Sequence, residues 1–114
     1  MPYISTKTTL SLSEEKKAAL AMRYGKAITL IPGKSEAHLM IGFEDGVTMY
    51  FAGSTGEPMA FVEVKLFGTA QAKDLDTLTK EICDILKDEL NISGDRVYVK
   101  YEEIAHWGWN GRNF

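Results

Sequence analysis

The chain has 114 residues, 45% of them hydrophobic, and carries a formal net charge of −3. This length suits a single domain, residues 1–114, that buries a core without cross-links, and the only cysteine, Cys83, excludes an internal disulfide. The acidic balance and the lack of a basic run with interleaved aromatic residues argue against a nucleic-acid partner. No apolar stretch approaches the roughly 20 residues of a membrane span, and no signal-peptide pattern is present. We therefore expect a cytoplasmic protein with no membrane partner.

The first part of the chain predicts a strand followed by a helix. Residues 2–8 have strand character, and either Ser11 or Ser13 is expected to cap the helix that follows. The helical segment presents a wide apolar arc, and we expect it to end at Pro32-Gly33, since proline and glycine terminate helices.

The middle of the chain predicts further strands. The segments 38–43 and 47–51 flank a turn at Glu44-Asp45-Gly46, so they are expected to form a hairpin. A loop rich in glycine follows over 53–58. Residues 59–67 then alternate between apolar and polar side chains, which is typical of a strand with one buried face.

The last part of the chain predicts a second helix, a strand and a tail. Residues 73–90 carry an apolar stripe at helical spacing, and Cys83 falls at its edge, so we expect this cysteine to pack rather than to react. Residues 96–102 alternate again as a strand. The aromatic tail, 103–114, contains Asn110-Gly111, a strong turn signal.

The two parts of the chain repeat the same order of elements. Strand–helix–strand units of this length build parallel strand pairs with right-handed crossovers. We therefore predict an α+β fold in which two βαβ pseudo-repeats, about 2–51 and 58–102, form a four-stranded mixed sheet with two helices on one face. The other face is mixed and rich in charge, and the exposed edge strands favour oligomerisation.

The N-terminus offers a candidate catalytic group. Aminopeptidases generally remove methionine before a small residue such as Pro2, which would leave a free secondary amine at the start of an ordered strand. An α-amino group has a low pKa for a cation, and burial beside another cation lowers it further, so this amine can act as a base near neutral pH. The alternative is a Met-Pro start without any catalytic role.

Four segments together resemble macrophage migration inhibitory factor and its tautomerase family. They are Pro2 at the processed N-terminus, Gly33-Lys34 after the first helix, Asp95-Arg96-Val97-Tyr98-Val99, and Gly108-Trp109-Asn110. The resemblance covers essentially the whole chain. It implies a homotrimer whose sheets surround a central channel, with active sites at the subunit boundaries. It also implies keto–enol tautomerisation of aryl pyruvates such as phenylpyruvate, with the proline amine as general base.

The resemblance assigns roles to three further residues. Lys34 matches the carboxylate-binding lysine, whose charge would also lower the pKa of the Pro2 amine. Phe67 stands where a backbone N–H binds the substrate carboxylate, and Tyr98 matches a pocket tyrosine that reaches across from the neighbouring subunit. Taken alone, Lys34 also fits a solvated loop residue, and Tyr98 fits an aromatic residue packed at an interface.

The same resemblance suggests an aromatic rim and one departure from the family pattern. His38, Tyr3, Trp109 and Phe114 would complete a rim suited to a phenyl ring, although His38 also fits a half-buried strand histidine without a catalytic role. Lys100 replaces the asparagine of the best-known members. This second cation either strengthens carboxylate binding or points into the central channel.

Three functions remain open on the sequence. The first is a cofactor-free isomerase, with no cofactor or metal site and a small 2-keto acid as substrate. The second is a cytokine-like signalling protein with a vestigial active site, since receptor binding leaves no readable motif and some family members are exported by non-classical routes. The third is a bare structural trimer. The segment Met59-Ala60-Phe61-Val62 replaces the Cys-x-x-Cys of some members, so thiol oxidoreductase activity is not expected.

Overall fold

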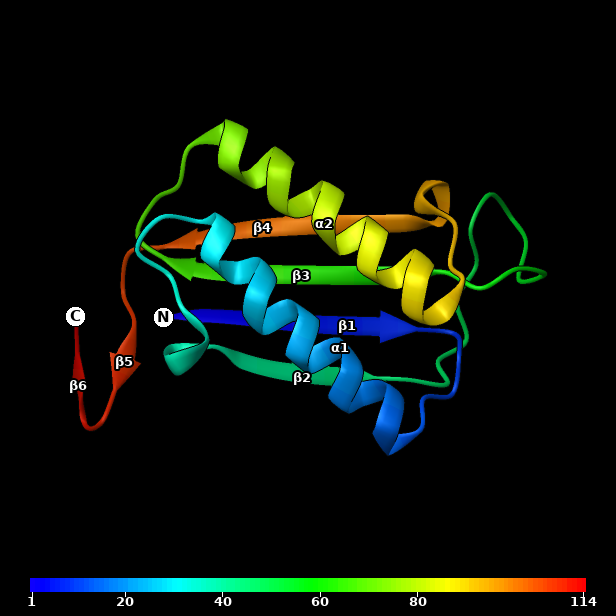
Figure 1. Ribbon diagram of the computed structural model, residues 1–114, viewed down its shortest axis with the longest axis horizontal. Helices are drawn as coiled ribbons and strands as arrows, with labels where there is room; N and C mark the ends of the chain where they lie inside the picture. Colours follow the sequence, from blue (N-terminus) through cyan, green and yellow to red (C-terminus); the bar gives the residue numbers. More distant parts are fainter.

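The computed structural model describes residues 1–114 and shows a four-stranded mixed sheet with both helices on one face (Figure 1). The strand order across the sheet is β2-β1-β3-β4. β1 pairs in parallel with β2, β3 in parallel with β4, and the two central strands are antiparallel. The strands are β1 (Pro2–Thr8), β2 (Met40–Glu44), β3 (Ala60–Phe67) and β4 (Val97–Ile104). The predicted α+β class with two βαβ units is confirmed.

Two α-helices pack against the sheet, α1 (Glu14–Ala27) and α2 (Ala72–Leu90). The Ser13 hydroxyl oxygen accepts a hydrogen bond from the Lys16 N–H at 3.1 Å, so Ser13 rather than Ser11 caps α1. α2 ends at Asn91, whose φ of 54° is left-handed, a conformation that asparagine tolerates at a helix end. Neither helix combines the length and apolarity that a membrane crossing requires.

The core lies between the helices and the sheet. Alternate residues of β1 and β3 are buried, because successive strand side chains point to opposite faces. One buried polar pair crosses this layer: the hydroxyl oxygens of Thr6 and Tyr24 lie 2.7 Å apart, so each group has a hydrogen-bond partner. The largest fully buried apolar side chains are Ile4, Leu20, Ile28, Ile31, Val62, Leu66, Leu78, Ile82, Ile85, Leu86 and Ile92.

The predicted return strand over 47–51 is wrong. The Val47 N–H donates instead to the carbonyl oxygen of Thr8, at 3.0 Å. The Asp45 carboxylate accepts a hydrogen bond from the Leu12 N–H at 2.7 Å. These contacts tie the chain after β2 to the end of β1, so it cannot fold back along β2 as a hairpin. A long loop follows, at the end of the sheet opposite the N-terminus (Figure 1).

Short 3-10 helices replace three predicted helix and strand ends. α1 continues as η1 (Ile28–Leu30), η2 (Glu36–His38) precedes β2, and η3 (Gly94–Arg96) precedes β4. His38 and Arg96 therefore lie outside the strands in which the sequence pattern placed them. In the tail, β5 (Gly108–Trp109) and β6 (Arg112–Asn113) form a small antiparallel hairpin.

Candidate active site

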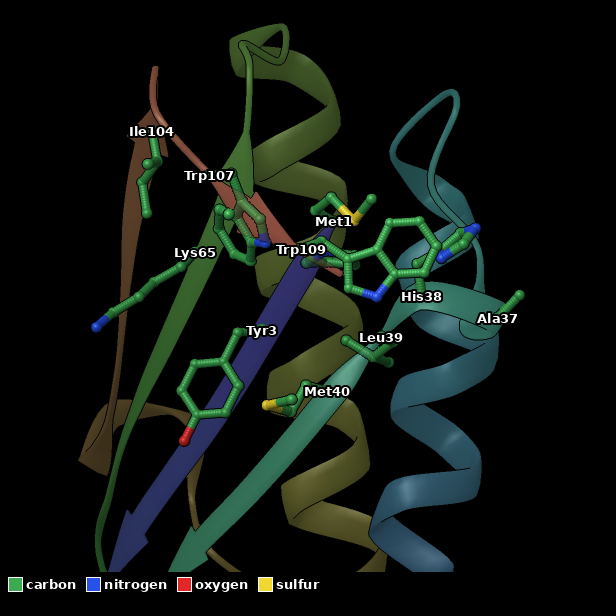
Figure 2. A pocket seen from close by; sticks show the side chains of 12 residues that line it. Met1, Tyr3, Ala37, His38, Leu39, Met40, Lys65, Ile104, Trp107 and Trp109 are labelled. Carbon is green, nitrogen blue, oxygen red and sulfur yellow. The ribbon is translucent and has the colours of Figure 1, made fainter. Parts of the chain in front are cut away.

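A cavity of about 660 Å³ opens at the N-terminal end of β1, on the sheet face that the helices leave free (Figure 2). This volume lies within the range of about 300–1,000 Å³ that is usual for small-molecule sites. Side chains from three neighbouring strands, Met40, Tyr3 and Lys65, form its floor. Trp107 and Trp109 come from the tail and form a wall over the floor.

Pro2 lines this cavity and is itself buried. Its position follows from the register of β1, because Pro2 pairs with Leu66 near the end of the adjacent strand. The α-amino group of the chain belongs to Met1, and burial first, then the positive charge of Lys34, lower the pKa of this amine below its usual 8.0. The electrostatic setting that a basic N-terminal amine needs is therefore present at this end of the sheet.

Lys34, Phe67 and the N-terminus are joined by two hydrogen bonds. The Lys34 Nζ donates to the carbonyl oxygen of Phe67 at 2.8 Å. The backbone N–H of Phe67 donates to the carbonyl oxygen of Met1 at 3.1 Å. Lys34 reaches this point because Gly33, with a φ of 82°, turns the chain after η1 back towards the sheet. Three predicted site residues are thus brought together by the fold.

The tail supplies most of an aromatic rim. The rings of His38 and Trp109 meet edge to face with centroids 5.6 Å apart, and the rings of Trp109 and Phe114 stack at 6.2 Å. Phe114 also contacts the Phe67 ring at 5.8 Å. The Asn110-Gly111 turn makes this possible: both residues have positive φ, as the tightest hairpin turns require.

Two close approaches position the remaining rim residues. Tyr3 lies across β2 at Gly42, where an added Cβ would come within 2.6 Å of the tyrosine hydroxyl oxygen. Glu36, in the turn that carries His38, packs its carboxyl group against Gly25 of α1, and a Cβ at Gly25 would overlap it. The lack of a side chain at both glycines therefore leaves room for the Tyr3 hydroxyl group and the Glu36 carboxyl group.

Tyr98 and Lys100 do not reach this cavity within one chain. Tyr98 lies at the start of β4, at the opposite end of the sheet, where its ring contacts Phe51 at 5.4 Å and Phe61 at 6.4 Å. Its side chain is 59% exposed. Lys100 lies on the same strand and pairs with Glu102 at 3.0 Å. The contribution of Tyr98 from a neighbouring subunit stays a prediction.

Sequence reasoning missed several residues that line the cavity, including Lys65, Met40, Trp107 and Ile104. The strand pattern could have identified Lys65, because it stands two residues before Phe67 on β3 and therefore lies on the same face of the sheet. Trp107 and Ile104 depend on how the tail folds back, which no local pattern shows. No group of three or more His, Cys, Asp or Glu side chains is arranged to hold a metal ion.

Comparisons with known proteins agree with this arrangement. Residues 1–114 match the family model of macrophage migration inhibitory factor (MIF). The chain is 33% identical over 91 residues to macrophage migration inhibitory factor of Xenopus laevis, with 78% of each chain covered. A Leishmania major MIF structure is 35% identical with a TM-score of 0.93, over 100% of this chain and 97% of that one. The Prochlorococcus marinus homologue is 29% identical with a TM-score of 0.88, over 98% of both chains.

Proposed function

The chain belongs to the macrophage migration inhibitory factor family, and on this basis we propose that it is a cofactor-free keto–enol tautomerase of 2-keto acids. The general base is the amine of Pro2, freed when Met1 is removed. The family lies within the tautomerase superfamily, which supports an isomerase in general terms. The substrate and the roles of individual residues are the proposal.

One observation carries this proposal: the Phe67 N–H donates a hydrogen bond to the Met1 carbonyl oxygen, next to Lys34. Removal of Met1 has two consequences at the same place. It converts the Pro2 nitrogen from an amide, which has no basicity, into a secondary amine. It also frees the Phe67 N–H to bind another oxygen. A substrate carboxylate that takes the place of the Met1 carbonyl therefore lies between an N–H donor, a lysine and the base.

The reaction needs few groups. With the carboxylate held by Lys34 and the Phe67 N–H, the Pro2 nitrogen takes a proton from C3 of the 2-keto acid. The electron pair of that C–H bond forms the C2–C3 double bond, and the ketone oxygen receives a proton to give the enol. A positioned general base contributes about 10²- to 10⁴-fold to such a step. Burial and the Lys34 charge lower the pKa of the Met1 amine, and we expect them to lower that of a freed Pro2 amine too, since Pro2 is buried at the same place.

The aromatic rim supports an aryl substituent on the substrate. His38, Trp109 and Phe114 form a continuous set of ring contacts beside the base. A phenyl ring attached to C3, as in phenylpyruvate, can pack against them. A protein of the same fold, with 21% identity and a TM-score of 0.84, was crystallised after inactivation by 2-oxo-3-pentynoate, itself a 2-keto acid.

The assembly we propose is a ring of three chains. The free sheet face has one aromatic cluster at the cavity and another, formed by Phe51, Phe61 and Tyr98, at the far end. If the far cluster of one chain covers the cavity of the next, the contact joins two different surfaces, and such heterologous contacts form a ring when the rotation between the chains closes. The number three comes from the family. Sedimentation of a stable single chain of 12.7 kDa at micromolar concentration would contradict it.

The decisive experiment compares the processed and unprocessed chains. Phenylpyruvate enolisation is followed by absorbance with protein whose lack of Met1 is verified by mass, and with protein that retains Met1. We expect the processed form alone to be active, while both give the same circular dichroism. Pro2→Gly in the processed form, which keeps a primary amine, is expected to be much slower. Equal rates with and without Met1 would show that Pro2 is not the base.

A cytokine-like role is the second candidate, favoured by the names of the curated relatives, which describe inhibition of macrophage migration. Such a role needs only an exposed surface, and the catalytic groups would then be vestigial. The same experiment separates the two. A processed, folded and assembled protein that fails to enolise any 2-keto acid would favour the surface role.

A further inference from the structure

The cavity has two sides with different chemistry. On the side of β2 its walls are aromatic and apolar, with His38, Met40 and Trp109. On the side of β3 and β4 it is lined by Ile104 and Lys65, and Lys65 is the only lysine or arginine that lines the cavity. Figure 2 shows the Lys65 side chain extending along the free face, away from Trp109 and towards the strand that carries Ile104.

Lys65 has no carboxylate partner in the protein. Its neighbour across β4 is Glu102, but Glu102 pairs with Lys100 at 3.0 Å, and no ion pair within 4.0 Å includes Lys65. The hydrogen bond and the charge of Lys100 lower the pKa of Glu102 most, and Lys65 contributes least. Lys65 therefore is a half-buried residue that lines a mainly apolar cavity and forms no direct ion pair, with Glu102 as a more distant negative charge.

The placement of the two lysines suits a particular ligand. The Lys34 Nζ is fixed at the Phe67 carbonyl oxygen, and Lys65 stands two residues before Phe67 on the same face of β3, which places its backbone roughly 6.5–7 Å along the strand from that of Phe67. Pro2 lies on the adjacent strand, paired with Leu66, which stands between Lys65 and Phe67. The base therefore lies near two lysines, one fixed at the end of β3 and one with a flexible side chain two residues before it, an arrangement that can hold a short molecule with a carboxylate at each end.

We propose that the site also accepts short 2-keto dicarboxylates, with Lys34 holding the carboxylate next to the ketone and Lys65 holding the distal one. The inference rests on the tautomerase function proposed above and adds a substrate class to it. The chemistry is unchanged: the Pro2 nitrogen takes the C3 proton, and the enol oxygen receives one. The phenyl ring of an aryl pyruvate extends towards Trp109, whereas a second carboxylate extends along β3 towards Lys65.

The test measures enolisation of oxaloacetate and of phenylpyruvate by processed wild-type protein and by Lys65→Met. Spontaneous enolisation of oxaloacetate is subtracted. Loss of a charge-assisted contact at a partly exposed site is expected to raise the KM for oxaloacetate by roughly 5- to 30-fold. The KM for phenylpyruvate should rise by a smaller factor than that for oxaloacetate, because phenylpyruvate has no second carboxylate for Lys65 to hold. Lys65→Arg, which keeps the charge, should retain most of the oxaloacetate activity.

Lys80→Met is the matched control. It removes the same charge from α2, on the other side of the sheet, where the Lys80 side chain is 79% exposed. We expect it to leave both KM values unchanged, which excludes an effect of net charge alone.

The outcomes separate this inference from the function on which it rests. Activity on phenylpyruvate with no saturable activity on oxaloacetate would overturn the dicarboxylate inference alone. An equal change in both KM values on Lys65→Met would do the same, because it would show a general effect on the site. Activity on neither substrate would overturn the proposed function itself.

Discussion

The first half of the molecule, from β1 to β2, and the second half, from β3 to β4, share one topology but differ in how the helix is joined to the strand that follows. After α2, six residues lead directly to β4 through η3. After α1, the chain makes two 3-10 helices and a left-handed turn at Gly33 before β2 begins. Lys34 and His38 both lie in this longer connection. Two residues of the candidate site thus lie where the first repeat departs from the second.

The helices differ in the same way. α2 has 19 residues and buries Leu78, Ile82, Ile85 and Leu86, all apolar. α1 has 14 residues, and its buried positions include Tyr24 and Gly25, a polar and a flexible residue. We infer that the second half supplies most of the packing energy, while the first half holds the base, Pro2, and the lysine beside it, Lys34. Four substitutions test this division.

Ile82→Ala should have the largest effect, on stability alone. Ile82 is completely buried in the core cluster, and truncation of a buried isoleucine costs about 2–5 kcal/mol. The unfolding free energy from urea titration should fall by this amount. The KM for phenylpyruvate, measured below the unfolding transition, should stay unchanged. A raised KM without loss of stability would contradict the division between the halves.

Lys34→Ala should instead change substrate binding, with little effect on the unfolding free energy. Loss of a charge-assisted contact to a carboxylate costs about 1.5–3 kcal/mol, or roughly 10- to 150-fold in KM. Lys34 also lowers the pKa of the N-terminal amine. Its removal therefore raises that pKa, and the free base, with the activity, should appear at higher pH.

The two effects of Lys34→Ala can fail separately. An unchanged KM would remove Lys34 from the binding site, and an unchanged pH midpoint would leave burial as the sole cause of the lowered amine pKa. The double variant Lys34→Ala, Lys100→Ala tests whether a neighbour's Lys100 shares the carboxylate. A double effect equal to that of Lys34→Ala would assign Lys100 no part.

Tyr24→Phe should cost somewhat less, about 1–2 kcal/mol, because it leaves the buried Thr6 hydroxyl without its partner. Burial raises the pKa of Tyr24 from 10.0 to about 12. Between these values the unfolded chain loses this proton while the folded chain keeps it, so stability falls as pH rises. In Tyr24→Phe the unfolding free energy should therefore fall less steeply with pH above about 10 than in the wild-type protein. An identical slope in both proteins would show that Tyr24 titrates alike folded and unfolded.

Arg23→Met should have the smallest effect. Arg23 of α1 lies 3.0 Å from Asp88 and 3.3 Å from Glu89 of α2, at the surface where the two halves meet. Surface ion pairs contribute about 0–1 kcal/mol and weaken with salt. The difference in unfolding free energy should therefore shrink in 1 M salt. A loss above 2 kcal/mol would show that this contact, and not the core, joins the halves.

The sequence predicted those features that depend on local periodicity. The four sheet strands, both helices and the Asn110-Gly111 turn agree with the structure. The approach of Lys34 to the N-terminus was implied by the family resemblance and not by periodicity. Residues 47–51 have the alternating pattern of a strand, but the Val47 N–H donates to the carbonyl oxygen of Thr8. Thr8 is distant in the sequence, so no local pattern shows this partner. His38 was misplaced because residues 36–38 form the 3-10 helix η2 and not the start of β2.

The approach of Glu36 to Gly25 has a consequence for how this protein can be improved. In a helix interior, alanine in place of glycine normally adds about 1 kcal/mol of stability. At Gly25 the added methyl group would meet the carboxyl end of the exposed Glu36 side chain, which has to turn away. Gly25→Ala is therefore expected to raise the unfolding free energy by less than this amount, because the Glu36 carboxyl group loses its place on α1. The missing methyl group thus leaves room for a carboxylate against the helix backbone, at a cost in helix propensity.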